Sequence, residues 1–125
     1  MEYSDIEMLK LELDLRRDIL EYRKKGEYMG IKIIKTEFEG TSGDCISHYK
    51  AKFEKNPTLG EFVDWILTNR KGEWGYIGKR ALCIEYRCGK ITCNHEQFEE
   101  HKNKKIRLLR MDGGWSRMDY TIEFV

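Results

Sequence analysis

The sequence predicts an α+β fold, in which an antiparallel β-sheet of about six or seven strands carries a long N-terminal helix and a second helix packed on one face. Segments with apolar residues every three or four positions are followed by segments in which apolar and polar residues alternate. Turn residues join most of the alternating segments closely, which favours antiparallel pairing. With 125 residues, 40% of them hydrophobic and 36% charged, the chain has the size and composition of a single globular domain.

The first element is expected to be a long helix within residues 1–26. Ser4 and Glu7 have the spacing of a capping box, and apolar residues then repeat with helical periodicity as far as Tyr22. Gly26 follows two lysines, which is typical of a helix end. The apolar surface is wider than one contact stripe. The helix therefore either lies across a sheet with its flank also covered or pairs with a second copy, and we favour homo-oligomerisation through this element.

Residues 30–125 are expected to form the α+β core, which begins with a hairpin. Residues 30–38 are rich in β-branched side chains, and a cluster of turn residues follows at 41–44. Residues 45–54 then alternate between apolar and polar side chains. This alternation predicts that Cys45 and every second residue after it face the core.

A second helix is predicted over residues 59–69. Thr58 and Glu61 form another capping box, and the apolar residues that follow have the spacing of one buried helix face. That face consists of Leu59, Phe62, Val63, Ile66 and Leu67. Residues 74–78 come next and indicate a short aromatic strand with close backbone approach at its glycines.

The clearest hairpin is predicted over residues 82–94. A two-residue turn at Cys88 and Gly89 would pair residue 87 with 90 and residue 86 with 91. This register places an apolar face opposite a mostly polar one, as a half-buried hairpin requires. The remaining elements are a short helix at 95–102, a strand at 106–111, a turn at 112–114 and a last strand that directs Met118, Tyr120, Ile122 and Phe124 inward.

The cysteines do not predict a metal site. Cys83, Cys88, Cys93 and His95 lie close together, but their spacing lacks the paired C-x2-C pattern of zinc sites. In the predicted hairpin Cys83 and Cys93 face opposite sides, and Cys88 is at the turn. We therefore expect free cysteines and no metal. A hydrolase that uses a cysteine and a histidine is the alternative, although no local signature supports it.

Charge and composition limit the remaining function classes. The net charge of +1 gives no support for nucleic-acid binding. No glycine-rich phosphate loop is present, so no nucleotide cofactor is expected. The longest apolar run is shorter than the roughly 18–20 residues needed to cross a membrane, and the N-terminus is acidic and polar. These features predict a cytoplasmic protein that does not associate with membranes.

The candidate functional surface lies near the C-terminus. Aromatic rings beside arginines can stack on a base or hold an anion, or they can form a contact surface for a protein. The candidates are Arg110, Trp115, Arg117, Asp119 and Tyr120, followed by Trp74 and Tyr76 if their strand is adjacent. Two structural explanations compete with this interpretation. The basic residues can protect a strand edge, and the tryptophans can pack in the core or at a subunit interface.

Three short motifs carry a resemblance to a known group of proteins. They are TLGEF at 58–62, GEWGYI at 72–77 and GGWSRMDY at 113–120. Together they resemble small uncharacterised proteins encoded by phages and mobile elements of gut and soil bacteria. The resemblance implies a non-enzymatic anti-defence protein, located in the host cytoplasm, that binds a host defence protein as anti-CRISPR proteins do or sequesters a nucleotide signal as a sponge does. A purely structural interaction module is a further alternative.

Overall fold

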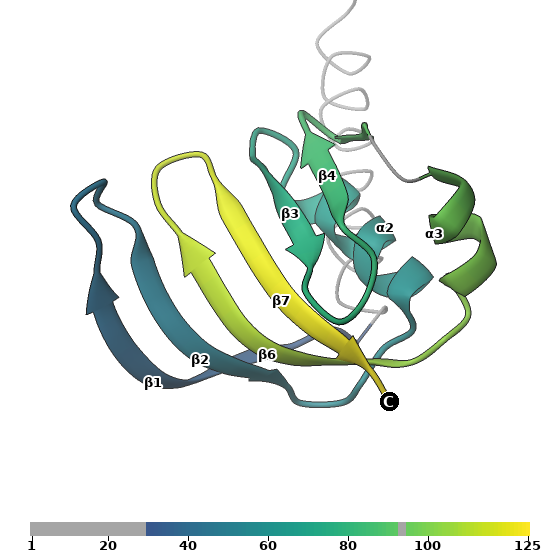
Figure 1. Ribbon diagram of the computed structural model, residues 1–125, viewed down its shortest axis with the longest axis horizontal. Helices are drawn as coiled ribbons and strands as arrows, with labels where there is room; N and C mark the ends of the chain where they lie inside the picture. The colour runs from purple at the N-terminus through teal and green to yellow at the C-terminus, as the bar shows by residue number, and fades with distance from the viewer. Residues whose placement is uncertain (1–29, 93–94) are drawn as a thin grey trace, which may run out of the picture. The chain divides into compact units, whose positions relative to one another are not determined.

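The computed structural model describes residues 30–92 and 95–125. Its strands are β1 (Ile33–Thr41), β2 (Ser47–Phe53), β3 (Trp74–Gly78), β4 (Ile84–Arg87), β5 (Lys90–Ile91), β6 (Ile106–Gly113) and β7 (Met118–Phe124). The helices in this part of the chain are α2 (Leu59–Asn69) and α3 (His95–His101). All seven strands belong to one sheet with the order β1-β2-β6-β7-β3-β4-β5 (Figure 1).

The predicted α+β class with an antiparallel sheet is wrong. The described residues form a largely β fold, because a mixed seven-stranded sheet carries only two short helices in this part of the chain. The parallel pair is β3 with β7, in which Ile77 lies beside Tyr120. The helix expected within residues 1–26, and self-association through it, lie outside the described residues.

The mixed sheet results from where the last hairpin inserts. β2 is antiparallel to β6, and β6 is antiparallel to β7, so that β2, β7 and β3 run in the same direction. The connection from β2 to β3 therefore has to cross over, and it does so through α2. The β6–β7 hairpin fills the space between β2 and β3. Tight turns in the sequence predict neighbouring strands only within each hairpin, which is why the parallel contact was not predicted.

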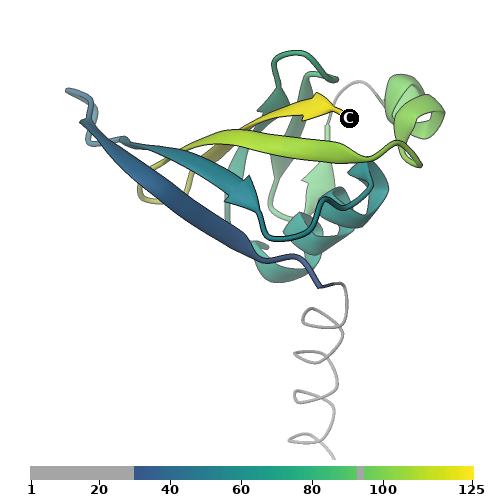
Figure 2. The same cartoon turned by 90° about the horizontal axis from the view of Figure 1, so that it is seen from below.

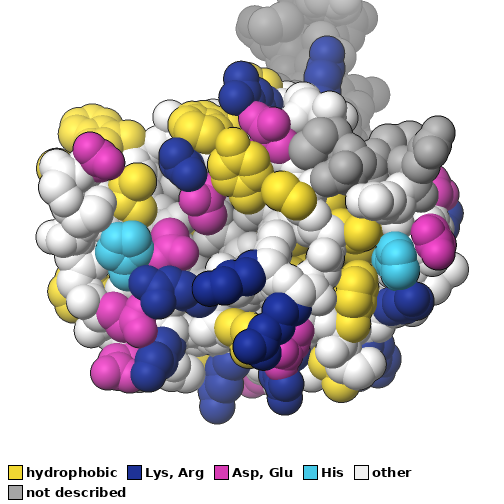
Figure 3. Space-filling view, in the orientation of Figure 1, with side chains coloured by type: hydrophobic (Ala, Val, Ile, Leu, Met, Phe, Trp, Pro, Cys, Tyr) yellow, Lys and Arg dark blue, Asp and Glu magenta, His cyan; other side chains and the backbone are white. Residues whose placement is uncertain are grey.

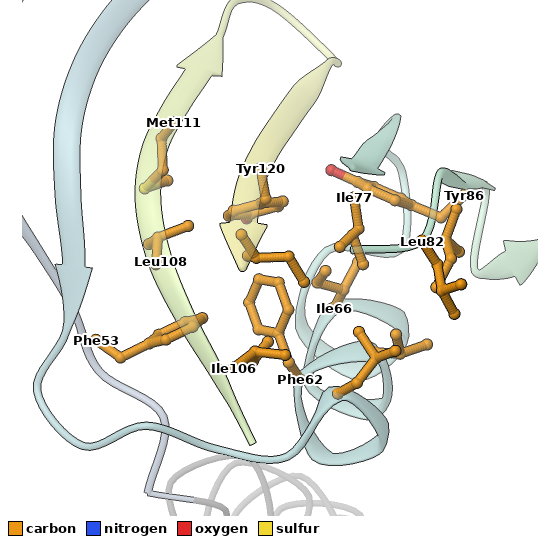
Figure 4. Packing of buried hydrophobic residues seen from close by; sticks show 14 of the residues in the cluster. Phe53, Phe62, Ile66, Ile77, Leu82, Tyr86, Ile106, Leu108, Met111 and Tyr120 are labelled. Atoms are coloured by element: carbon orange, nitrogen blue, oxygen red, sulfur yellow. The ribbon is translucent and has the colours of Figure 1, made fainter. Parts of the chain in front are cut away.

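The core lies between the sheet and α2. The capping box at Thr58 and Glu61 is confirmed. Of the predicted helix face, α2 buries Leu59, Phe62, Val63 and Ile66, whereas Leu67 is only partly buried. Figure 4 shows Phe62 and Ile66 of this helix beside buried residues of the strands. The sheet bends around α2 (Figure 2). Burying these apolar side chains stabilises the fold by roughly 1.5–3 kcal/mol each.

Two of the predicted hairpins are confirmed. β1 pairs with β2, and β4 pairs with β5 in the predicted register of residues 87 with 90 and 86 with 91. Cys88 and Gly89 both have positive φ, of 49° and 79°, as a type I′ turn requires. The predicted pairing of residues 84 and 93 lies partly outside the described residues.

Two local predictions need correction. Cys45 is exposed rather than in the core, because it adopts a φ of 62° in the turn before β2 and so does not continue the alternation of that strand. Asp112 and Gly113 were predicted in a turn, but they extend β6 and pair with Asp119 and Met118. The turn itself therefore begins two residues later, at Gly114.

The described helices contain no segment that is both long enough and apolar enough to span a membrane.

Candidate functional site

Most of the predicted site residues lie on the face of the sheet opposite α2, which we call the outer face. Ile77 and Tyr120 are paired across β3 and β7 and are both buried toward α2. Because side chains alternate along a strand, Tyr76 and Asp119 point to the other side. The same alternation places Trp74 there, beside Arg117. Figure 3 looks onto this face, on which basic, acidic and apolar side chains lie next to one another.

Six side chains of the outer face form a regular arrangement of two rows, which we call the array. Its first row crosses three strands and consists of Arg117, Trp74 and Arg87. Its second row consists of Asp119, Tyr76 and Glu85. β3 thus contributes two aromatic rings, and β4 contributes Arg87 and Glu85. Asp119 belongs to β7, and Arg117 directly precedes that strand.

Both arginines of the array lie against the indole of Trp74. The guanidinium carbon of Arg117 is 4.6 Å from the centroid of that ring and 5.7 Å from the centroid of the Tyr76 ring. The guanidinium carbon of Arg87 is 5.4 Å from the same indole. These distances are within the range of cation–π attraction, so the two cations hold the aromatic side chains in place.

Each arginine of the array is paired with a carboxylate on its own strand. Arg117 Nη2 donates to Asp119 Oδ2 at 2.8 Å, and its Nε donates to the same carboxylate at 3.2 Å. Arg87 Nε donates to Glu85 Oε1 at 2.7 Å. The hydrogen bond to Asp119 raises the pKa of Arg117, which stays charged at all physiological pH values.

A second polar network lies beside the array and contains the predicted residue Arg110. Arg110 Nη1 contacts Glu39 Oε2 at 2.8 Å, and Arg110 Nε donates to Asp112 at 3.1 Å. The Nδ1 atom of His48 forms a hydrogen bond with the same Asp112 carboxylate. Asp112 is paired with Asp119 across β6 and β7, so this network continues into the second row of the array.

Trp115 lies apart from these networks, in the β6–β7 turn. It is 97% exposed, the highest value among the large hydrophobic residues described. Neither core packing nor protection of a strand edge explains why a tryptophan occupies this exposed position. An indole that is fully exposed on a monomer is a candidate contact for another molecule.

Tyr120 does not belong to the outer face. Its ring is buried in the core, where it meets Phe62 edge-on at a centroid distance of 5.0 Å. Its hydroxyl has no hydrogen-bond partner among the described residues. Tyr86 packs nearby and donates its hydroxyl proton to the carbonyl oxygen of Met118. The structure thus brings six of the seven predicted residues to one face or its adjoining turn and places the seventh inside.

The two buried tyrosines predict a loss of stability in alkaline solution. Burial raises the pKa of both Tyr86 and Tyr120, in the case of Tyr120 against the opposing charge of Arg70. An unfolded chain releases these protons near pH 10, whereas the folded chain retains them, so the full stability is present below about pH 10 and is lost as the pH rises further. Above pH 10 the free energy of unfolding therefore falls with rising pH, and Tyr120→Phe should make this fall less steep by about 1.4 kcal/mol per pH unit.

Urea unfolding at several pH values between neutral and strongly alkaline measures that slope. At neutral pH the Tyr120→Phe variant should be about as stable as the wild type, because the hydroxyl forms no hydrogen bond among the described residues. If Tyr120→Phe loses stability as steeply as the wild type above pH 10, the buried Tyr120 hydroxyl does not contribute to the alkaline loss of stability.

The cysteines and histidines of the described residues do not gather into a metal-binding arrangement. No group of three or more His, Cys, Asp or Glu side chains within 30–92 and 97–125 has the required geometry. Cys83 and Cys88 are both exposed. Cys93 and the side chain of His95 lie outside what the structure describes, so the predicted absence of a metal site stays a prediction.

Sequence reasoning missed several residues of the outer face, among them His48, Glu85, Arg87 and Asp112. The Glu-Tyr-Arg run at 85–87 has the alternation that pairs with Trp-Gly-Tyr at 74–76, and this signal could have identified Glu85 and Arg87. His48 and Asp112 are 64 positions apart and meet only because β2 pairs with β6. No local pattern contains that information.

Comparison of the chain with protein-family models, with curated proteins and with solved structures gave no match.

Proposed function

We propose that this protein is a non-enzymatic binding protein that uses its outer face and the adjoining Trp115 as the contact surface for another protein. The array is the observation that carries the proposal. Tryptophan, tyrosine and arginine are the residue types that dominate binding energy at protein interfaces. Here they are held in fixed positions by ion pairs and cation–π contacts, which reduces the side-chain entropy lost on binding.

The charge arrangement favours a protein partner over a nucleotide signal. A site that sequesters phosphate requires cationic groups that are free to neutralise it. The arginines of the array are already paired with Asp119 and Glu85, and Arg110 is paired with Glu39 and Asp112. The positive charge that a doubly charged phosphate needs is therefore already balanced by these carboxylates. Binding of a nucleotide signal is therefore the second candidate, supported by the aromatic rings beside arginines.

The biological role that we propose is inhibition of a host defence protein during phage–host conflict. This role rests on the resemblance of three motifs to small phage and mobile-element proteins. Two of those motifs, at 72–77 and 113–120, contain Trp74, Tyr76, Trp115, Arg117 and Asp119. These two motifs thus coincide with the outer face and its adjoining turn, as a shared binding role would require.

A plaque assay tests this role. In bacteria that each carry one defence system, expression of the protein should restore plaque formation by a phage that the system blocks. Trp115→Ser should reduce this restoration by roughly tenfold or more, because an exposed tryptophan at an interface is a common hot spot. The fold should be unaffected, since Trp115 is exposed and outside the core.

Restoration in none of the systems would overturn the anti-defence role. Full restoration by Trp115→Ser would remove Trp115 from the contact surface. The control is Phe38→Ser, which removes another exposed aromatic side chain, located on the edge strand β1 at the far side of the sheet from β3. This control should restore plaque formation as well as the wild type does.

A further inference from the structure

On the outer face, each arginine is more exposed than the carboxylate that holds it. Arg87 is 60% exposed, whereas its partner Glu85 is 21% exposed. Glu123 is 14% exposed and is held between Arg80 and Arg107, which are 72% and 56% exposed. Arg110 is likewise more exposed than Glu39 and Asp112, and Arg117 is more exposed than Asp119.

This order creates two layers of charge on the outer face. The carboxylates lie against the sheet, and the guanidinium groups of five arginines lie outside them. The lysine pair of Lys50 with Glu37 does not follow this order, since its two side chains are about equally exposed. The layering is therefore a property of the arginine pairs and does not hold for every ion pair of the sheet.

Each guanidinium of the outer layer retains donors that can bind another molecule. A guanidinium has five N–H groups in one plane. In Arg117 the Nε and Nη2 atoms donate to Asp119, and in Arg87 the Nε atom donates to Glu85. The carboxylates fix the orientation of the guanidinium planes before any partner arrives. Such preorganised forks match the geometry of a second carboxylate.

We infer that the outer face binds an acidic segment of the partner protein, whose Asp and Glu carboxylates accept hydrogen bonds from this arginine layer. The inference rests on the proposed function and specifies the chemistry of the partner. DNA or RNA fits less well, because its backbone carries a charge on every phosphate and the net charge of the chain is only +1. The carboxylates of an acidic segment each carry a single charge on a flexible side chain, so they can contact the arginines individually and leave the aromatic rings of the array for apolar contacts.

Binding of a short labelled poly-L-glutamate peptide, measured by fluorescence anisotropy, tests the inference. The wild-type protein should bind this peptide at low salt and release it at high salt, since the contacts are exposed to solvent. Arg87→Gln/Arg117→Gln should bind roughly tenfold more weakly. The control is Lys55→Gln/Lys104→Gln, which removes the same charge from turns outside the sheet and should bind as the wild type does.

Three outcomes would overturn the inference. The wild type could fail to bind poly-L-glutamate, the arginine variant could bind it as tightly as the wild type, or a labelled oligothymidylate of matched length could bind more tightly than the peptide. The plaque assay separates these failures from failure of the proposed function. If the arginine variant loses plaque restoration although poly-L-glutamate does not bind, the outer face is a binding surface for a partner of different chemistry. If the variant restores plaques fully, the proposed surface itself is wrong.

Discussion

Gly75→Ala is expected to abolish the native fold or to destabilise it by about 3 kcal/mol or more. A Cβ atom added at Gly75 would lie 1.6 Å from the carbonyl oxygen of Met118 and 2.7 Å from the hydroxyl of Tyr86. The first of these atoms is backbone, and it accepts the hydrogen bond of Tyr86. The clash can be relieved only by moving β3 away from β7. That movement would disrupt the single parallel junction that joins the β3–β4–β5 part of the sheet to the rest.

Chemical denaturation of Gly75→Ala and of the matched variant Gly72→Ala measures this effect. A Cβ atom at Gly72 meets nothing within 4 Å, and Gly72 lies in the turn before β3. Gly72→Ala should therefore change stability by no more than about 0.5 kcal/mol, with a slight gain possible from the less flexible unfolded chain. A Gly75→Ala protein that unfolds at the same denaturant concentration as the wild type would contradict the described junction.

Phe62→Ala is expected to destabilise the fold by about 3–5 kcal/mol, because it leaves a cavity at the centre of the core. Phe62 is fully buried on α2. The centroid of its ring is 4.9 Å from the ring centroid of Phe53 and 5.0 Å from that of Tyr120, and both contacts are edge-on. These contacts join α2 to β2 and β7, so the substitution weakens the attachment of the helix to both strands.

The matched control for this prediction is Phe38→Ala, which makes the same chemical change at a site that is 59% exposed. The ring of Phe38 packs against that of Tyr49 at the edge of the sheet, with a centroid distance of 5.2 Å. Its removal should cost only about 0.5 kcal/mol. Equal losses of stability in the two variants would show that α2 does not pack on the sheet as described.

Local patterns in the sequence were sufficient to predict the elements that are stabilised locally. The capping box of Thr58 and Glu61 and the apolar spacing after it predicted α2, and the turn at Cys88 and Gly89 predicted the register of β4 with β5. These predictions succeeded because the interacting residues are close in the sequence. The β1–β2 hairpin was predicted for the same reason.

The arrangement of the hairpins within the sheet could not be predicted in this way. Nothing near β7 in the sequence indicates that it pairs in parallel with β3. The alternation along β7 did predict that Tyr120 faces inward, and the ring is buried. The positive φ of Cys45 ended the alternation that was expected to bury it. Of the candidate site, the pair of Arg117 with Asp119 was predictable because both residues alternate on one strand. The contribution of Arg87 depended on strand pairing instead.

The central claim is that the arginine and aromatic side chains of the outer face form the contact surface. Plaque restoration by Arg87→Gln/Arg117→Gln, compared with Lys55→Gln/Lys104→Gln at matched expression and melting temperature, tests it most directly. We predict that the arginine variant loses restoration by roughly tenfold or more, because two preorganised contacts are removed together, while the lysine variant restores plaques as the wild type does. Equal restoration by both variants would contradict the claim.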